Sequence, residues 1–183
     1  QSISHSLAKR LLSASFNNKQ IESSTKILEN GNIEFYFWDD IKGKNAFWHS
    51  SAHLFAQIIL ELYPKSKLTI GPPIDNGFYY DVDLGDKIIS ENDFEKIEKM
   101  MIDEARKDHK FILRESSKKD ALDFYKKNGN QYKTELINDL NDEKITFCDH
   151  ANFSDLCKGG HIPSTGHIKA VKLLNVAGAY WRG

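Results

Sequence analysis

Two pairs of residues that can act as catalysts or metal ligands stand about a hundred positions apart in the sequence. The first pair is His49 and His53, in the stretch "WHSSAHLFAQ" at 48–57. The second is Cys157 and His161, in "CKGGH". Two imidazoles one helical turn apart can bind one metal ion, share one water molecule, or have no joint role. The first pair therefore indicates a site only if partners reach it from elsewhere in the chain.

Together, the four side chains would form one polar cluster, for which three kinds of chemistry remain open. A structural zinc site would use all four in a closed tetrahedron, whereas a catalytic metal site would leave one position for water. A metal-free hydrolytic pocket would use a histidine as general base, with neighbouring donors stabilising an oxyanion. The glycines at 159 and 160 let the backbone turn sharply beside this cluster.

Composition narrows the class of protein. A chain of 183 residues with 40% hydrophobic content is long enough for one domain of fair size, or a medium domain with a small appendage. The net charge of -1 argues against indiscriminate binding of polyanions. Cys148 and Cys157 are too few for a disulfide framework and favour a reducing compartment. No membrane span or secretory signal is evident, so we expect a cytoplasmic location.

The segment that carries the first histidine pair is predicted to be a helix. It should end near Tyr63, because Pro64 cannot continue a helix. At helical spacing, His49 and His53 project away from the apolar stripe. That stripe comprises Trp48, Ala52, Phe55, Ile59 and Leu62.

A small unit is expected before this helix, and a mixture of helices and strands after it. Residues 1–42 should contain a helix around 3–12, a turn at Asn17-Asn18 and a strand at 33–38, with a linker at 39–45. Strands are predicted at 67–70, 78–84, 145–150 and 170–181. Capping boxes at Ser90 and Ser117 should begin two helices, the second stopped by Gly129. The predicted fold class is α+β with a largely antiparallel sheet.

Three stretches carry a resemblance to a known family. They are "WHSSAHL", "IGPPIDNGFYYDVDL" and "DLCKGGHIPSTGHIKAVKLLNVAGAYWRG". The sequence resembles the amino-terminal editing region of threonyl-tRNA synthetase over about residues 46–183. The paired His-x3-His and Cys-x3-His halves are shared with the alanyl-tRNA synthetase editing domain and its free-standing relatives. "GPPIDNGFYYD" and "AGAYWRG" indicate the threonyl enzyme specifically.

The resemblance implies two domains and an activity. Residues 1–42 would be a shortened ubiquitin-like (TGS) domain, β-rich, and residues 43–183 the editing domain, of the second additional domain type. In this family the editing site hydrolyses the ester of serine attached to threonine tRNA. A synthetic site built for threonine rejects serine only through one missing methyl group, worth roughly 1–3 kcal/mol, so a second, smaller sieve is needed.

The resemblance also implies roles for particular residues. The catalytic group would be His49, His53, Lys133, Cys157 and His161. The substrate-binding group would be Gly71, Tyr80 and Asp155, with the carboxylate suited to the free ammonium of the amino acid. His150 and His167 fall outside the pattern and are interpreted as surface or tRNA-facing residues.

The resemblance also implies which cofactors and partners to expect. The alanyl-type relatives bind zinc, but this chain follows the threonyl pattern, so no metal is expected; if zinc is present, His49, His53, Cys157 and His161 would hold it. The partner would be the acceptor end of threonine tRNA carrying serine, with lysines at 118–127 and 169–172 near its stem. Nothing resembles class II ATP-binding motifs. ATP, a catalytic zinc and the homodimer interface would belong to the core of the parent ligase.

Two other function classes remain open. One is a free-standing trans-editing hydrolase of alanyl type. The other is a non-enzymatic RNA-binding module in which the four-residue cluster holds a structural zinc ion. In the second case chelation would unfold the domain and replacement of Lys133 would leave function intact, whereas an editing site predicts the reverse.

Overall fold

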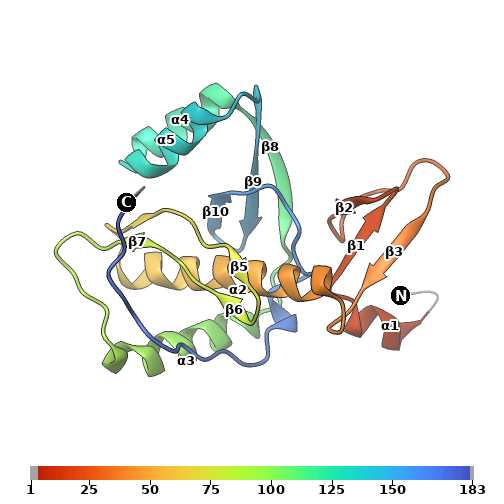
Figure 1. Ribbon diagram of the computed structural model, residues 1–183, viewed down its shortest axis with the longest axis horizontal. Helices are drawn as coiled ribbons and strands as arrows, with labels where there is room; N and C mark the ends of the chain where they lie inside the picture. The colour runs from red at the N-terminus through yellow and green to blue at the C-terminus, as the bar shows by residue number, and fades with distance from the viewer. Residues whose placement is uncertain (1–3, 182–183) are drawn as a thin grey trace.

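A long helix, α2 (Ile41–Leu62), runs through the middle of the protein (Figure 1). The computed structural model describes residues 4–181. A small sheet lies at the amino-terminal end of α2, a second sheet and a helical hairpin lie along it, and α3 (Phe94–Ala105) lies on another side (Figure 1). The predicted α+β class with antiparallel sheets is confirmed.

The amino-terminal module consists of one short helix and three antiparallel strands. These are α1 (His5–Arg10), β1 (Ser13–Phe16), β2 (Lys19–Ile21) and β3 (Ile33–Tyr36), in the sheet order β2-β1-β3. Asn17 and Asn18, with φ of 48° and 64°, form the predicted turn between β1 and β2. Asparagine tolerates this left-handed conformation better than most residues.

The linker expected at 39–45 is wrong, because α2 already begins at Ile41. The Asp40 carboxylate accepts a hydrogen bond from the Phe37 N–H at 2.8 Å, which ties the helix start to the end of β3. A Cβ atom at Gly43 would overlap the Phe37 backbone, so glycine permits this close approach. The domain boundary between residues 42 and 43 stays a prediction.

The central part of α2 is buried on nearly every side. Leu54, Ile58 and Ile59 pack with Ile97 and Met101 of α3 in the main core. On its other faces, Ser50, Ser51, His53 and Gln57 are also buried. The apolar stripe predicted for this helix therefore covers only part of its contacts, and polar side chains are enclosed beside it.

The hairpin expected from strands at 67–70 and 78–84 is divided into two short ladders. β4 (Lys67–Leu68) pairs with β7 (Val82–Asp83), and β5 (Pro73–Ile74) pairs with β6 (Gly77–Phe78). Prolines at 72 and 73 lack the backbone N–H that a continuous ladder requires.

The second sheet has the order β10-β9-β8 and is antiparallel throughout. It contains β8 (Ile112–Ser117), β9 (Lys144–His150) and β10 (Phe153–Leu156). Only β9 was predicted; β8 and β10 were not. α4 (Lys118–Lys127) and α5 (Gln131–Asp139) cover part of this sheet, with Tyr125, Ile137 and Phe147 in the shared core.

The two helix starts predicted at Ser90 and Ser117 are found in the structure. The Ser90–Asp93 capping box is confirmed and precedes the 3₁₀ turn η1 (Glu91–Asp93), which leads into α3. Ser117 caps α4, and Gly129 follows it with φ of +65°.

The strand expected at 170–181 is wrong. After the 3₁₀ turn η2 (Thr165–His167), residues 168–180 form no regular element. The segment is held by the Glu98 carboxylate of α3, which accepts the Leu173 N–H at 2.7 Å and pairs with Lys172 at 3.1 Å. Within the described residues, no helix is long and apolar enough to cross a membrane.

Candidate functional site

The two predicted residue pairs meet in one cluster. His53 Nε2 lies 3.2 Å from His49 Nε2, and Cys157 Sγ lies 3.4 Å from His49 Nε2 and 3.2 Å from His161 Nε2. The contacting nitrogen and sulfur atoms of these four side chains all lie within 4.8 Å of one another. Residues far apart in sequence therefore form one contiguous group.

Two local structures bring the pairs together. One turn of α2 separates His49 from His53, so both imidazoles lie on the same side of the helix. β10 ends at Leu156, and the chain then turns through Gly159 and Gly160, with φ of +94° and +90°. These values are in the left-handed region that favours glycine, and they return the chain so that His161 faces Cys157.

Burial keeps His49, His53 and Cys157 uncharged at neutral pH. Burial, followed by the charge of His161, lowers the pKa of His49 to about 4. Burial, followed by His49, also holds the pKa of His53 well below its usual value. The thiol of Cys157 has its pKa raised to about 12, again chiefly by burial. The histidines at 49 and 53 are thus neutral imidazoles that can accept a proton or bind a metal.

A buried carboxylate, Asp155, organises the neighbouring part of the site. It pairs with Lys133 Nζ at 2.8 Å and accepts hydrogen bonds from Tyr80 at 3.0 Å and Tyr125 at 2.9 Å. Lys133 and Asp155 are each only 3% exposed. Burial and the nearby carboxylate raise the pKa of both tyrosines well above its usual value, so their hydroxyls remain donors.

Asn130 places Lys133 at the start of α5. The Asn130 side chain caps this helix by accepting the Lys133 N–H at 3.1 Å. Its amide group also donates to the Leu68 carbonyl at 2.9 Å, which anchors α5 to β4. The lysine is therefore held at both its backbone and its ammonium group.

Gly71 lies against the ring of Tyr80. A Cβ atom at position 71 would overlap that ring. The glycine thus allows the chain at 69–72 to pack closely on the Tyr80 ring. Its effect on the site is therefore to hold Tyr80 in place.

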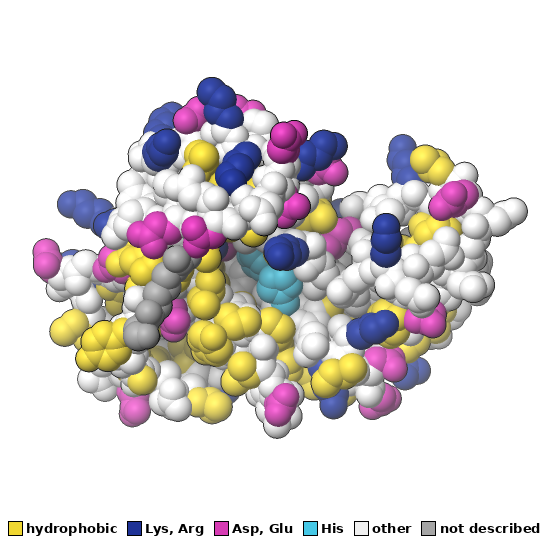
Figure 2. Space-filling model, turned by 45° about the horizontal axis from the view of Figure 1, so that its top comes forward, with side chains coloured by type: hydrophobic (Ala, Val, Ile, Leu, Met, Phe, Trp, Pro, Cys, Tyr) yellow, Lys and Arg dark blue, Asp and Glu magenta, His cyan; other side chains and the backbone are white. Residues whose placement is uncertain are grey.

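A cavity of about 570 Å³ opens beside the cluster. Figure 2 shows histidine side chains at the bottom of a hollow on this face of the molecule. Of the predicted site residues, all but His161 line the cavity: His49, His53, Gly71, Tyr80, Lys133, Asp155 and Cys157. His161 is 1% exposed and stands behind Cys157.

The four-residue cluster has a set of donor atoms that zinc can use. In tetrahedral coordination with zinc's usual bond lengths, neighbouring ligand atoms are about 3.3–3.6 Å apart. Three of the six separations among His49, His53, Cys157 and His161 are 3.2–3.4 Å, and all six are within 4.8 Å. His161 also directs its other ring nitrogen at a carboxylate, a common arrangement for metal-bound histidines.

One predicted location is wrong, and two contributors were missed. His150 is not a surface residue: it is 2% exposed, packed between Phe111 and Phe153. Neither of its ring nitrogens has a hydrogen-bond partner among residues 4–181. The two missed residues are Tyr125, which contacts Asp155, and Glu22, which contacts His161. The sequence pattern around each of them does not indicate a functional site.

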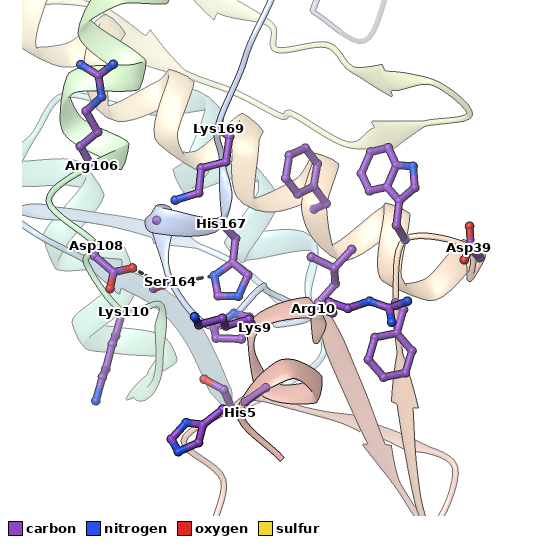
Figure 3. A pocket seen from close by; sticks show the side chains of 18 residues that line it. His5, Lys9, Arg10, Asp39, Arg106, Asp108, Lys110, Ser164, His167 and Lys169 are labelled. Atoms are coloured by element: carbon purple, nitrogen blue, oxygen red, sulfur yellow. Dashed lines mark hydrogen bonds between the residues drawn. The ribbon is translucent and has the colours of Figure 1, made fainter. Parts of the chain in front are cut away.

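A second, larger cavity of about 1040 Å³ lies between α1 and the segment around η2. Basic side chains surround it, including Lys9, Arg10, Lys110 and Lys169, while Asp108 is engaged by Ser164 (Figure 3). His167, expected at the surface, is half-buried there. No residue of the histidine and cysteine cluster lines this larger cavity. The candidate site is therefore the smaller of the two cavities.

Comparisons with known proteins support the resemblance found in the sequence. Residues 145–182 match the family described as "Threonyl and Alanyl tRNA synthetase second additional domain". Threonine-tRNA ligases of Flavobacterium psychrophilum and Flavobacterium johnsoniae are each 56% identical over 183 residues, and that of Cytophaga hutchinsonii is 48% identical over 182. Each match covers 100% of this chain, which spans 28% of the length of these relatives.

We predict that Asp155→Ala destabilises the fold strongly. Removing the carboxylate leaves the Lys133 ammonium buried without its counter-charge, and breaking a buried pair costs about 3–5 kcal/mol. Urea denaturation should show this loss in the free energy of unfolding. Asp123→Ala is the matched control, because it removes an exposed pair with Lys119 and should cost about 1 kcal/mol or less. Equal losses in the two variants would contradict the prediction.

Proposed function

Because this chain is homologous along its whole length to a segment of the threonine-tRNA ligases, we propose that it is the part that corrects their errors. It would hydrolyse the ester that joins serine to threonine tRNA. The observation that supports this most directly is that the 570 Å³ cavity is lined by two neutral imidazoles, a thiol and a lysine–aspartate pair. General base and electrostatic groups for ester hydrolysis are thus available around one space.

In the proposed reaction, a water molecule attacks the ester carbonyl of the bound aminoacyl group. His49 is the proposed general base, because it lines the cavity and is more exposed than His53. It takes the proton from water as the carbon–oxygen bond forms. The bond between the carbonyl carbon and the ribose oxygen then breaks, and the protonated His49 returns this proton to the ribose oxygen, which releases serine and free tRNA.

Lys133 is proposed to stabilise the negative charge that develops on the carbonyl oxygen of the ester. Its ammonium is held by Asp155 in a buried environment, where a fixed charge acts more strongly than in water. Asp155 already accepts hydrogen bonds from two tyrosines besides its pair with Lys133. We therefore propose that it orients Lys133 and Tyr80, in place of the direct contact with the substrate ammonium suggested by the resemblance.

Selection against threonine is proposed to arise from the fixed wall of the cavity. Tyr80 is hydrogen-bonded to Asp155 and packed on Gly71, so it cannot move without disturbing both. The additional methyl group of a threonyl ester would meet this wall. Steric exclusion from a close-packed surface is the second sieve that the synthetic site needs.

The proposed partner is the acceptor end of threonine tRNA. Lys158 is exposed and lines the cavity, so it is placed to meet a phosphate at the mouth. Two lysines first assigned to the acceptor stem have partners within the protein: Lys118 donates to the Asn138 carbonyl at 3.2 Å, and Lys172 pairs with Glu98. ATP-dependent ligation of threonine and dimerisation are proposed for the longer parent protein.

We propose that the site works without a resident metal. A zinc ion held by His49, His53, Cys157 and His161 would supply a Lewis acid and a water of lowered pKa. However, the Lys133 ammonium lines the same cavity as His49, His53 and Cys157, and its positive charge would repel a divalent cation bound there. The Cys157 thiol, with a pKa of about 12, must also lose its proton before it can bind metal.

The zinc-stabilised RNA-binding module remains the second candidate, because three histidines and a cysteine are a ligand set that zinc uses. Elemental analysis of protein purified without added metal separates the two. We predict well under one equivalent of zinc and an unchanged melting temperature after treatment with a chelator. Stoichiometric zinc, with unfolding on chelation, would favour the structural metal site.

Replacement of the proposed base tests the function itself. His49→Ala should lower the rate of deacylation of seryl-tRNA(Thr) by about 100-fold or more, as is typical for loss of a general base. His5→Ala is the control, since His5 is exposed on α1 and does not line the 570 Å³ cavity. The proposal fails if the His49 variant retains the full rate.

A further inference from the structure

The amino-terminal module contributes a side chain to the histidine and cysteine cluster. Glu22, just after β2, directs Oε1 at His161 Nδ1 at 3.2 Å and accepts the Gly160 N–H with the same oxygen at 2.7 Å. Glu22 is 7% exposed and His161 is 1% exposed. A single buried oxygen therefore holds both the imidazole and the backbone of the loop that carries it.

The packing around this contact is close. A Cβ atom at Gly159 would lie 3.0 Å from Glu22 Oε1, and one at Gly160 would lie 3.0 Å from the Gln20 side-chain oxygen. The side chains at the end of β2 thus rest directly on the diglycine loop. The positive φ values favour glycine at both positions, and a side chain at either one would also crowd Glu22 or Gln20.

The hydrogen bond determines which ring nitrogen carries hydrogen. Oε1 of Glu22 accepts the Gly160 N–H, so this oxygen is a hydrogen-bond acceptor. A carboxylate oxygen in this role offers no hydrogen to His161. Nδ1 of His161 must then be the donor, and in the neutral ring this leaves Nε2 as an acceptor facing Cys157 Sγ at 3.2 Å.

We propose that Glu22 is a positioning residue for the editing reaction, fixing the tautomer and orientation of His161, so that the amino-terminal module completes the site. This inference rests on the proposed function for its catalytic consequence. It assigns the amino-terminal module a direct part in organising the site, through the contact of Glu22 with His161. In metal sites, carboxylate partners of this kind change activity by about 10–100-fold when they are removed.

The first test uses the unaltered chain. Two-bond ¹H–¹⁵N NMR spectra of the histidine rings distinguish the two tautomers, and His161 should carry its proton on Nδ1. A His161 with its proton on Nε2 alone would overturn the proposal. The NMR measurement of the tautomer does not depend on catalysis. Its result can therefore contradict the proposed role of Glu22 even if the chain is a deacylase, and the reverse also holds.

Variants of the module then link tautomer to rate. Glu22→Ala should shift His161 toward the Nε2–H form and lower kcat/KM for seryl-tRNA(Thr) by about tenfold or more, mainly through kcat. Glu22→Gln should retain most of the rate, because its amide oxygen can still accept both hydrogen bonds. A loss in the glutamine variant as large as that in the alanine variant would overturn the proposal.

Glu34→Ala is the matched control for damage to the module. Glu34 also lies in this small sheet and accepts hydrogen bonds from Tyr36 and Ser15 there. Its removal should leave both the tautomer of His161 and the rate unchanged. A loss equal to that of Glu22→Ala would show that general disruption of the module, and not the contact with His161, is responsible.

Discussion

The structure depends on one buried interaction, the pairing of the Lys133 ammonium with the Asp155 carboxylate. Neither charge could remain in the interior alone, because an unpaired buried ion is far more costly than an unpaired polar group. The carboxylate also fixes two tyrosines, which join strands and helices from different parts of the chain. Through Tyr80 it sets the wall of the cavity, and through Lys133 it places a positive charge beside the imidazoles.

Around this pair, the protein assembles one site from segments far apart in the sequence. α2 supplies two histidines, the loop after β10 supplies a thiol and a third histidine, and α5 supplies the lysine. The amino-terminal module supplies Glu22 behind His161. Buried polar networks of this type are stable only when each member has its partner. The helix start at Ile41, directly after β3, keeps the module close enough to provide one.

The sequence predicted the fold class and the grouping of the four histidine and cysteine side chains, but not every strand. The two four-residue spacings and the family resemblance identified residues that the structure brings to one cavity, because helix and turn geometry are local properties. The strand expected at 170–181 was wrong, since an apolar run does not reveal whether a neighbouring strand is available. Glu22 and His150 were missed or misplaced because their burial depends on distant segments. A lone glutamate or histidine carries no periodic signal.

The most direct test of the proposed function is a comparison of two substrates. The rates at which this chain deacylates seryl-tRNA(Thr) and threonyl-tRNA(Thr) should be measured side by side, with and without a chelator. A small cavity with a fixed wall and a metal-free base predicts rapid loss of the seryl ester alone, unaffected by chelation. Equal hydrolysis of the two esters, or activity abolished by the chelator, would contradict this account.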